Sequence, residues 1–131
     1  MNPKPDQAES NIFAPAINGI LHCIREEKNC RIHLVFTIAA LSANCILKIS
    51  SLEWCLILFV IGSVWTAEIM NTAIERTIDL VTDEYHPLAK LGKDMAAGAV
   101  LISAGISVLT GLIIYLPKLF PFLQSVIELL R

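Results

Sequence analysis

The chain has 131 residues, of which 55% are apolar and 17% charged, and its mean hydropathy is +0.64. So large an apolar share with so few charges is typical of a membrane protein rather than of a water-soluble domain. The formal net charge is −2 and no basic patch with interleaved aromatic residues occurs, so we expect no nucleic-acid partner. The length predicts one domain over residues 1–131.

The chain begins with a polar tail and a helix of mixed character. Residues 1–11 are polar and include two prolines, which predicts a loose tail. Over residues 12–29 apolar side chains recur at helical spacing and a run of charges closes the segment. This pattern predicts an amphipathic helix at a membrane surface rather than a helix packed on a soluble core.

Three largely uncharged stretches follow, and each predicts a membrane span. The first is expected over residues 32–49, the second over 54–82 with a cytosolic extension, and the third over 94–116. The third is rich in small residues, which let helices approach closely in lipid, and Pro117 and Pro121 are expected to end it. The predicted fold class is therefore an all-α integral membrane protein with three transmembrane helices and an N-terminal amphipathic surface helix.

Lysine and arginine residues predict the orientation. Three spans with a cytoplasmic N-terminus place seven of these residues inside and three outside. If the second span starts near Glu53, Glu68 lies ~22 Å along it and Glu75 ~33 Å. In a hydrocarbon core ~30 Å thick, Glu68 is then within the lipid and Glu75 at the cytosolic boundary. Glu27 precedes the first span by about one and a half turns and is expected at the same boundary.

A stripe of polar side chains runs along the second span. Its members fall within roughly 80° of each other on an otherwise apolar helix. They are Glu68, Asn71, Glu75 and Asp79. Magnesium is typically held by one or two carboxylates together with nucleotide phosphates, so Glu27 and Glu75 form a candidate metal site. A base buried in lipid suits a hydroxyl that stays in the membrane, which predicts phosphoryl transfer to a lipid alcohol.

Other interpretations of these residues predict different chemistry. A small proton-coupled transporter would place its carboxylates near the midplane, whereas the predicted cluster lies toward the cytosol. A zinc site built from the cysteines and histidines around residue 30 has no standard ligand spacing, and the four cysteines indicate no disulfide framework. The residues concerned are His22, Cys23, Cys30 and His33.

Two runs of sequence resemble the signatures of the small bacterial diacylglycerol kinase family. One reads Glu27-Lys28-Asn29-Cys30-Arg31-Ile32-His33, and the other combines Glu68-x-x-Asn71-Thr72-Ala73-Ile74-Glu75 with Glu84-Tyr85-His86-Pro87 and Lys93-Asp94. The resemblance covers roughly residues 12–116. It implies a homotrimer of three-span subunits in the bacterial inner membrane, with active sites shared between neighbouring subunits.

The same resemblance implies roles for individual residues. Glu68 matches the catalytic base, and Asn71 matches an essential polar residue near the catalytic centre. Glu27 and Glu75 match the pair that holds Mg²⁺ with the nucleotide. Further contacts with ATP are matched by four residues that follow the stripe: Glu84, His86, Lys93 and Asp94.

Several polar residues also have an ordinary structural interpretation. Glu75 could pair with Arg76 or Lys90 as an interface charge. Asp79 could be a solvated residue at a helix end, and Asp94 could cap the N-terminus of the third span.

The identity of the acceptor lipid depends on the branch of the family. Thr72 and the segments 86–90 and 96–101 are similar to the Gram-positive type, whose members phosphorylate undecaprenol. We therefore expect undecaprenol as acceptor, with diacylglycerol as the alternative. The chain departs from the proteobacterial branch at His33, where that branch has a carboxylate, and no arginine precedes Arg25 to make its N-terminal ATP contact.

Overall fold

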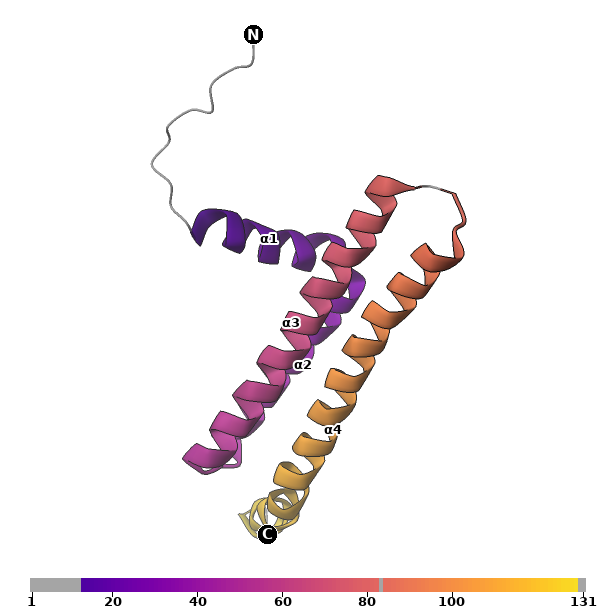
Figure 1. Cartoon of the computed structure of the whole chain (residues 1–131). Coiled ribbons are helices and arrows are strands. Elements are labelled where there is room, and N and C mark those ends of the chain that lie inside the picture. Colours follow the sequence, from indigo (N-terminus) through magenta and orange to yellow (C-terminus); the bar gives the residue numbers. More distant parts are fainter. Residues whose placement is uncertain (1–12, 83, 130–131) are drawn as a thin grey trace.

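The computed structural model describes residues 13–82 and 84–129, and all regular structure in this part of the chain is helical. The helices are α1 (Phe13–Glu26), α2 (Lys28–Ile46), α3 (Ser51–Val81) and α4 (Pro87–Leu129). α3 and α4 form a long antiparallel pair, α2 lies beside α3, and α1 crosses one end of this bundle (Figure 1). The tail expected over residues 1–11 lies outside the described residues.

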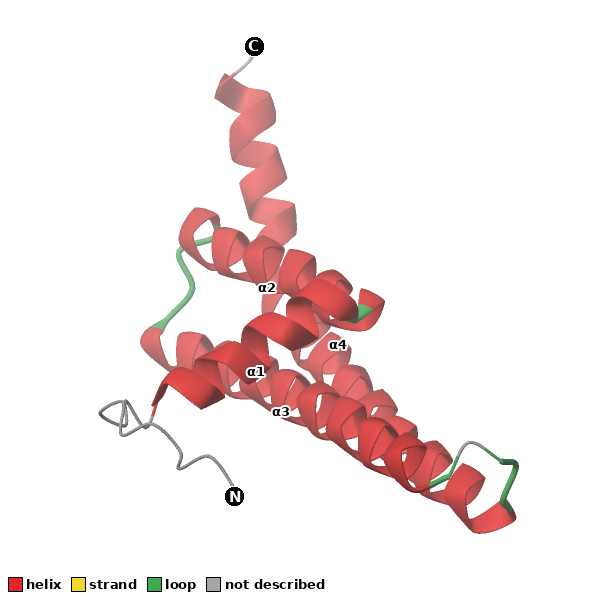
Figure 2. Ribbon diagram, turned by 90° about the horizontal axis from the view of Figure 1, so that it is seen from above, coloured by secondary structure: helices red, strands yellow, loops and turns green. Residues whose placement is uncertain are grey.

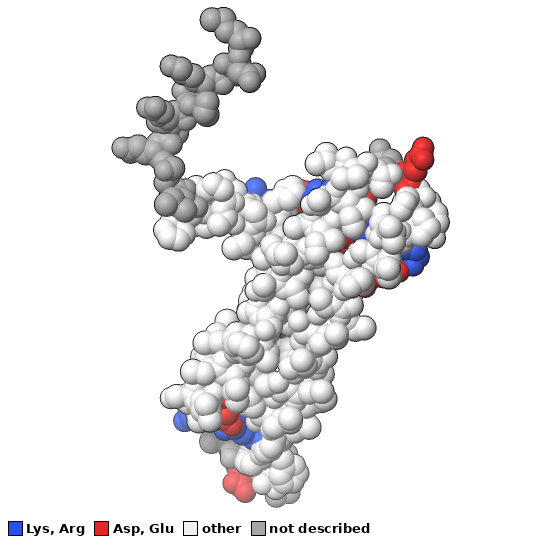
Figure 3. All heavy atoms as spheres, viewed as in Figure 1, with Lys and Arg blue, Asp and Glu red and all other residues white. Residues whose placement is uncertain are grey.

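Three of the helices are long and apolar enough to cross a membrane. They are α2 and α3, with 19 and 31 residues, and a 42-residue stretch of α4. On the face drawn in Figure 3, charged side chains gather at the two ends of the bundle and leave an uncharged belt between them. Many large apolar side chains are exposed along this belt, as a lipid environment allows. The predicted class of a multi-pass, all-α membrane protein with three candidate spans is confirmed.

The boundary between the first two helices differs from the predicted one. α1 ends at Glu26 and α2 begins at Lys28, so a one-residue break at Glu27 replaces the continuous helix expected over residues 12–29. The Glu27 backbone is extended, with φ −96° and ψ 126°, although its N–H still donates to the carbonyl of Cys23 at 2.9 Å. The chain therefore turns from α1 into the first span within a single residue.

The expectation that Pro117 and Pro121 end the third span is wrong. α4 continues through both prolines to Leu129. Proline removes one backbone hydrogen bond and pushes the preceding turn aside, which bends a helix without necessarily ending it. Seen from above, the last part of α4 turns away from the direction of the bundle (Figure 2).

α4 also begins earlier than the predicted residue 94. Its first residue is Pro87, a favourable residue at the first position of a helix because its missing N–H would have no helical partner. The N–H of Leu88 donates to Nδ1 of the preceding His86 at 3.2 Å. This local contact fixes the turn into α4, so several residues of the expected cytosolic loop are helical.

Polar contacts between the helices complement the small apolar core. The hydroxyl of Tyr115 on α4 lies 2.6 Å from Oδ1 of Asn44 on α2, which is fully buried. Two turns earlier on α2, Oγ1 of Thr37 accepts a hydrogen bond from Nε1 of Trp65 on α3 at 3.0 Å. Hydrogen bonds between helices stabilise bundles in lipid, where apolar burial supplies little driving force. These contacts hold α2 against α3 and α4.

The start of α3 is fixed by a capping box. The backbone N–H of Ser50 donates to Oε2 of Glu53 at 2.7 Å, and the hydroxyl of Ser50 accepts from the Glu53 N–H at 3.4 Å. Nζ of Lys118 on α4 also donates to this carboxylate, at 2.9 Å. At the end of the bundle farthest from α1, Glu53 thus caps α3 and links this helix to α4 through Lys118.

Candidate active site

The break between α1 and α2 decides where the Glu27 side chain lies. Glu27 is the N-cap residue of α2, but its carboxylate makes no capping bond to that helix. Its Oε1 instead accepts a hydrogen bond from Nη2 of Arg76 on α3 at 2.9 Å. The corner therefore brings a carboxylate from the start of α2 to the C-terminal half of α3.

The polar stripe on α3 faces the bundle at one end and an open cleft at the other. Glu68, Asn71 and Thr72 are buried, with Glu68 only 2% exposed. Nδ2 of Asn71 donates to Oε1 of Glu75 at 3.1 Å, so the amide joins the buried and the open parts of the stripe. Seven residues of helix separate Glu68 from Glu75, a rise of ~10 Å.

Glu27 and Glu75 line the same cleft. This open cleft has a volume of about 450 Å³ and is bordered by four charged residues and one apolar residue. Its lining consists of Glu27, Glu75, Arg76, Asp79 and Leu80. Carboxylate oxygens are the ligands that Mg²⁺ prefers in proteins, and two of them with bound phosphates make a common magnesium site. The depth estimate that placed Glu27 and Glu75 at one level agrees with this geometry.

α4 contributes a cation at the border of this cleft. Nζ of Lys93 pairs with Oδ1 of Asp79, which joins α4 to the end of α3. The Lys93 side chain is about one third exposed. A phosphate placed in the cleft would therefore find a flexible cation within reach, in a pair that exchanges readily because both partners are partly solvated.

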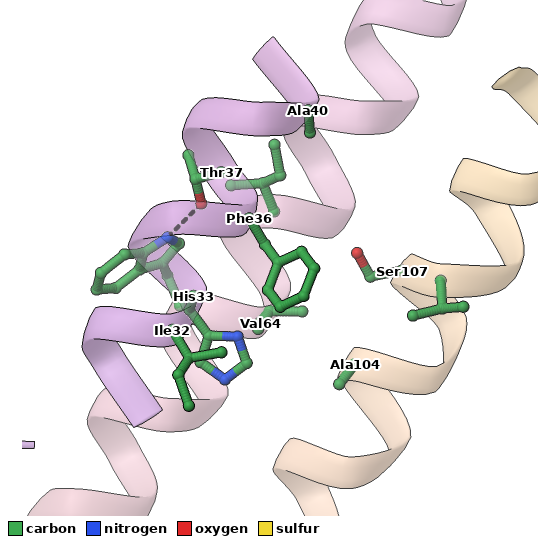
Figure 4. Close-up of a pocket in the computed structure, with 11 residues that line it drawn as sticks. Ile32, His33, Phe36, Thr37, Ala40, Val64, Ala104 and Ser107 are labelled. Atoms are coloured by element: carbon green, nitrogen blue, oxygen red, sulfur yellow. Dashed lines mark hydrogen bonds between the residues drawn. The ribbon is translucent and has the colours of Figure 1, made fainter. Parts of the chain in front are cut away.

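A second, apolar groove opens between α2 and α4. It has a volume of about 280 Å³ and its floor is formed by α3. In Figure 4, Phe36 and His33 extend from α2 toward this space, and Ala104 and Ser107 of α4 face it. Glu68 does not line the groove, but its Oε2 lies 4.0 Å from Nε2 of His33. The structure thus has a charged cleft at the C-terminal end of the stripe and an apolar groove beside its buried end.

Comparison with known proteins identifies the family. The family described as prokaryotic diacylglycerol kinase matches residues 14–115. The chain belongs to this family. It is accordingly a lipid kinase, and membership implies ATP as the phosphate donor. The polar stripe of α3, the α1–α2 corner and the first two-thirds of α4 all fall inside the matched region.

The relatives include enzymes named undecaprenol kinase and enzymes named diacylglycerol kinase. The chain is 46% identical over 107 residues to the undecaprenol kinase of Bacillus subtilis, covering 82% of this chain and 87% of that protein. It is 35% identical over 108 residues to a diacylglycerol kinase of Synechocystis, covering 82% and 62%. It is 34% identical over 76 residues to the diacylglycerol kinase of Escherichia coli, covering 58% and 62%.

The predicted site residues of this diacylglycerol kinase family member fall into two groups. The first group is joined by the cleft and the stripe: Glu27, Glu68, Asn71, Glu75 and Lys93. The second group lies outside the cleft lining, on or after the α3–α4 loop: Glu84, His86 and Asp94. Glu84 and His86 are exposed, and His86 borders a separate surface hollow with residues from the ends of α3 and α4. No contact between the two groups occurs among the described residues except through the helices that carry them.

Two structural interpretations of the charged residues need correction. Asp94 does not cap the third span, because α4 begins at Pro87; it pairs instead with Lys90, one turn earlier on the same helix. Arg76 pairs with Glu27 rather than with Glu75. Neighbouring side chains on a helix point in different directions, so Arg76 faces the α1–α2 corner while Glu75 receives the Asn71 amide.

The cysteines also differ from expectation. Cys23 and Cys30 form a disulfide that joins α1 to α2 across Glu27, with their Cα atoms 6.1 Å apart. Both residues are buried, and their pairing removes them from any zinc site. No group of three or more metal-binding side chains occurs in the described part of the chain. The spacing of the cysteines in the sequence does not predict this disulfide, because the turn at Glu27 is what brings Cys23 and Cys30 together.

Two residues of the cleft lining are not predicted as such by the sequence pattern. The pattern indicates Arg76 as a partner of Glu75 and Asp79 as a solvated residue at a helix end. Both line the cleft, and both pair with residues outside α3: Arg76 with Glu27 at the α1–α2 corner and Asp79 with Lys93 of α4. The depth estimate could have predicted the pairing of Arg76 with Glu27. It places Glu27 at the level of Glu75, and Arg76 is the basic residue of α3 next to that level.

Proposed function

We propose that this lipid kinase transfers the γ-phosphate of ATP to the hydroxyl group of undecaprenol and forms undecaprenyl phosphate and ADP. The observation that carries the proposal is a buried carboxylate, Glu68, about 10 Å along one helix from a carboxylate-lined cleft. This arrangement offers a base to a hydroxyl inside the membrane and a polar site to a nucleotide at its surface. The choice of undecaprenol is supported by the 46% identity to an enzyme of that name.

The cleft residues fit a magnesium–nucleotide complex. Glu27 and Glu75 are the carboxylates that would hold Mg²⁺ together with the nucleotide phosphates. When bound, Mg²⁺ neutralises charge on the phosphates. Lys93 then exchanges Asp79 for a phosphate oxygen, and Glu84, His86 and Asp94 contact the rest of ATP.

Glu68 acts on the acceptor in this scheme. Its carboxylate takes the proton of the lipid hydroxyl as the hydroxyl oxygen forms a bond to the γ-phosphorus, while the bond from that phosphorus to the bridging oxygen of ADP breaks. Burial of Glu68 excludes water, which would otherwise compete for the phosphoryl group. Asn71 holds Glu75 through its amide and so couples the metal site to the position of the base.

The proposal includes an assembly and an orientation. α1 lies along the cytosolic face of the inner membrane, the N-terminus is cytoplasmic, and three copies of the chain form a homotrimer with shared active sites. Many apolar side chains of α2 and α4 are exposed in the single chain, which is compatible with contacts to lipid and to neighbouring subunits. The charged cleft then faces the compartment that contains ATP.

A phosphorylation assay with two lipids tests the proposal. The purified protein in detergent micelles is given Mg²⁺, ATP labelled in its γ-phosphate, and either undecaprenol or diacylglycerol at equal mole fraction. We expect label in the undecaprenol product, with kcat/KM at least about tenfold higher than for diacylglycerol. Preference for diacylglycerol would refute the assigned acceptor, and absence of label in both lipids would refute the proposed function.

A further inference from the structure

One carboxylate oxygen of Glu68 lacks a hydrogen-bonding partner among the described residues. Its side chain is 2% exposed, and Oε2 accepts no hydrogen bond from any described residue. A carboxylate buried in this way is costly unless polar groups compensate it. The imidazole of His33 on α2 approaches this atom, with Nε2 at 4.0 Å from Oε2.

His33 also borders the apolar groove, which Glu68 does not. The His33 side chain is 19% exposed and lines the space between α2 and α4 (Figure 4). The rest of the lining is mostly apolar, so the imidazole is a polar group between the groove and the buried carboxylate. A hydroxyl that approaches Glu68 from the groove passes this ring.

The distance between the two groups identifies the kind of contact. At 4.0 Å the pair is too long for a hydrogen bond, but an approach of about 1 Å brings it into the normal range. Hydrogen bonds in catalytic sites are often long without substrate and shorten when it binds.

We propose that His33 is a positioning residue for the acceptor site: its Nε2–H donates a hydrogen bond to Oε2 of Glu68 and leaves the other carboxylate oxygen directed at the lipid hydroxyl. This inference rests on the proposed function, because it gives Glu68 the role of base. In this role His33 orients Glu68 and makes no contact with the phosphoryl group. A side chain with an N–H at the same position can therefore replace it, whereas an apolar ring cannot.

Substitutions of His33 test the role of its N–H. Glutamine can place its amide nitrogen near the position of Nε2, whereas phenylalanine keeps the ring without a donor. We expect His33→Phe to lower kcat about tenfold to a hundredfold, the effect of losing one hydrogen bond to a charged group. KM for MgATP should change less than about twofold, and His33→Gln should restore kcat to within about threefold of the wild type.

His22→Phe is the matched control, because His22 is an exposed histidine of α1 outside the site. Its kcat is expected to equal that of the wild type. Thermal midpoints confirm that each variant folds, and His33→Leu replaces the phenylalanine variant if that ring does not fit. Equal losses in His33→Gln and the apolar variant, or wild-type kcat in the apolar variant, would overturn the proposal.

A double substitution separates positioning from general damage. In a Glu68→Gln background, adding His33→Phe should cause no further loss, because the two residues act as one unit. An independent, multiplied loss would contradict the assignment.

Imidazole ¹⁵N shifts provide a measurement without turnover. The shift of His33 should change in Glu68→Gln and not in Glu53→Gln, which removes a carboxylate at the far end of α3. If the wild type phosphorylates neither lipid, the proposed function fails, while this measurement still decides whether His33 and Glu68 interact. Unchanged His33 shifts in Glu68→Gln would overturn the contact itself.

Discussion

Replacing Glu68 by glutamine removes the buried carboxylate and keeps the size of the side chain. A general base contributes about 10²- to 10⁴-fold to a reaction, so kcat should fall by that factor, equivalent to about 2.7–5.4 kcal/mol. The nucleotide cleft lies ~10 Å farther along α3, beyond direct contact with residue 68. KM for MgATP should therefore change less than about twofold.

The substitution should leave the fold intact. Glu68 is nine-tenths or more buried, and Oε2 has no hydrogen-bond partner among the described residues. Glutamine keeps the shape of this side chain without placing an ionisable group in the buried position, so the exchange costs little stability. The thermal midpoint of Glu68→Gln is thus expected to equal or exceed that of the wild type.

Glu53→Gln provides a matched control on the same helix. Glu53 lies 15 residues earlier, about 22 Å from Glu68, and pairs with Lys118 at the opposite end of the bundle. The assay follows transfer of labelled γ-phosphate to each lipid in micelles under saturating MgATP. The base assignment fails if Glu68→Gln keeps more than about one third of the wild-type kcat, or if both variants lose activity equally.

Contacts elsewhere in the molecule lead to three more expected outcomes. Glu75→Gln should raise the Mg²⁺ concentration for half-maximal activity about tenfold or more, because one of two carboxylates is lost; an unchanged requirement would exclude it from the metal site. Tyr115→Phe should lower the free energy of unfolding by about 1–3 kcal/mol in an SDS titration, because fully buried Asn44 loses its hydroxyl partner; an unchanged titration would deny that contact a stabilising role. Alkylation followed by mass spectrometry should label two of four cysteines before reduction and all four after it; full labelling before reduction would show that Cys23 and Cys30 are thiols.

The cysteine measurement also bears on the orientation of the chain. Disulfides are uncommon in proteins that face the reducing cytosol. The Cys23–Cys30 pair lies at the end of the bundle that the distribution of Lys and Arg places inside the cell. The redox state of Cys23 and Cys30 in cells therefore tests the predicted cytoplasmic N-terminus independently of the distribution of Lys and Arg.

The helical spans and the polar stripe could be predicted because they depend on local properties. A run of apolar residues long enough to cross a bilayer must satisfy its own backbone hydrogen bonds, which favours a helix whatever its neighbours are. Helical periodicity then places Glu68, Asn71 and Glu75 on related faces without reference to other segments. The predicted end of the third helix at Pro117 and Pro121 was wrong, because a proline can bend a helix without ending it.

The sequence by itself determined that three helices could span a membrane and that a carboxylate would be buried in one of them, because hydrophobicity and periodicity act within a segment. Only the tertiary structure decided the partners: Arg76 for Glu27, Lys93 for Asp79, and the proximity of His33 to Glu68. These contacts depend on how α1 turns into α2 and where α2 and α4 lie against α3, and no pattern within a single helix encodes those positions. The buried acid was visible in the sequence, but its surroundings required the packed helices.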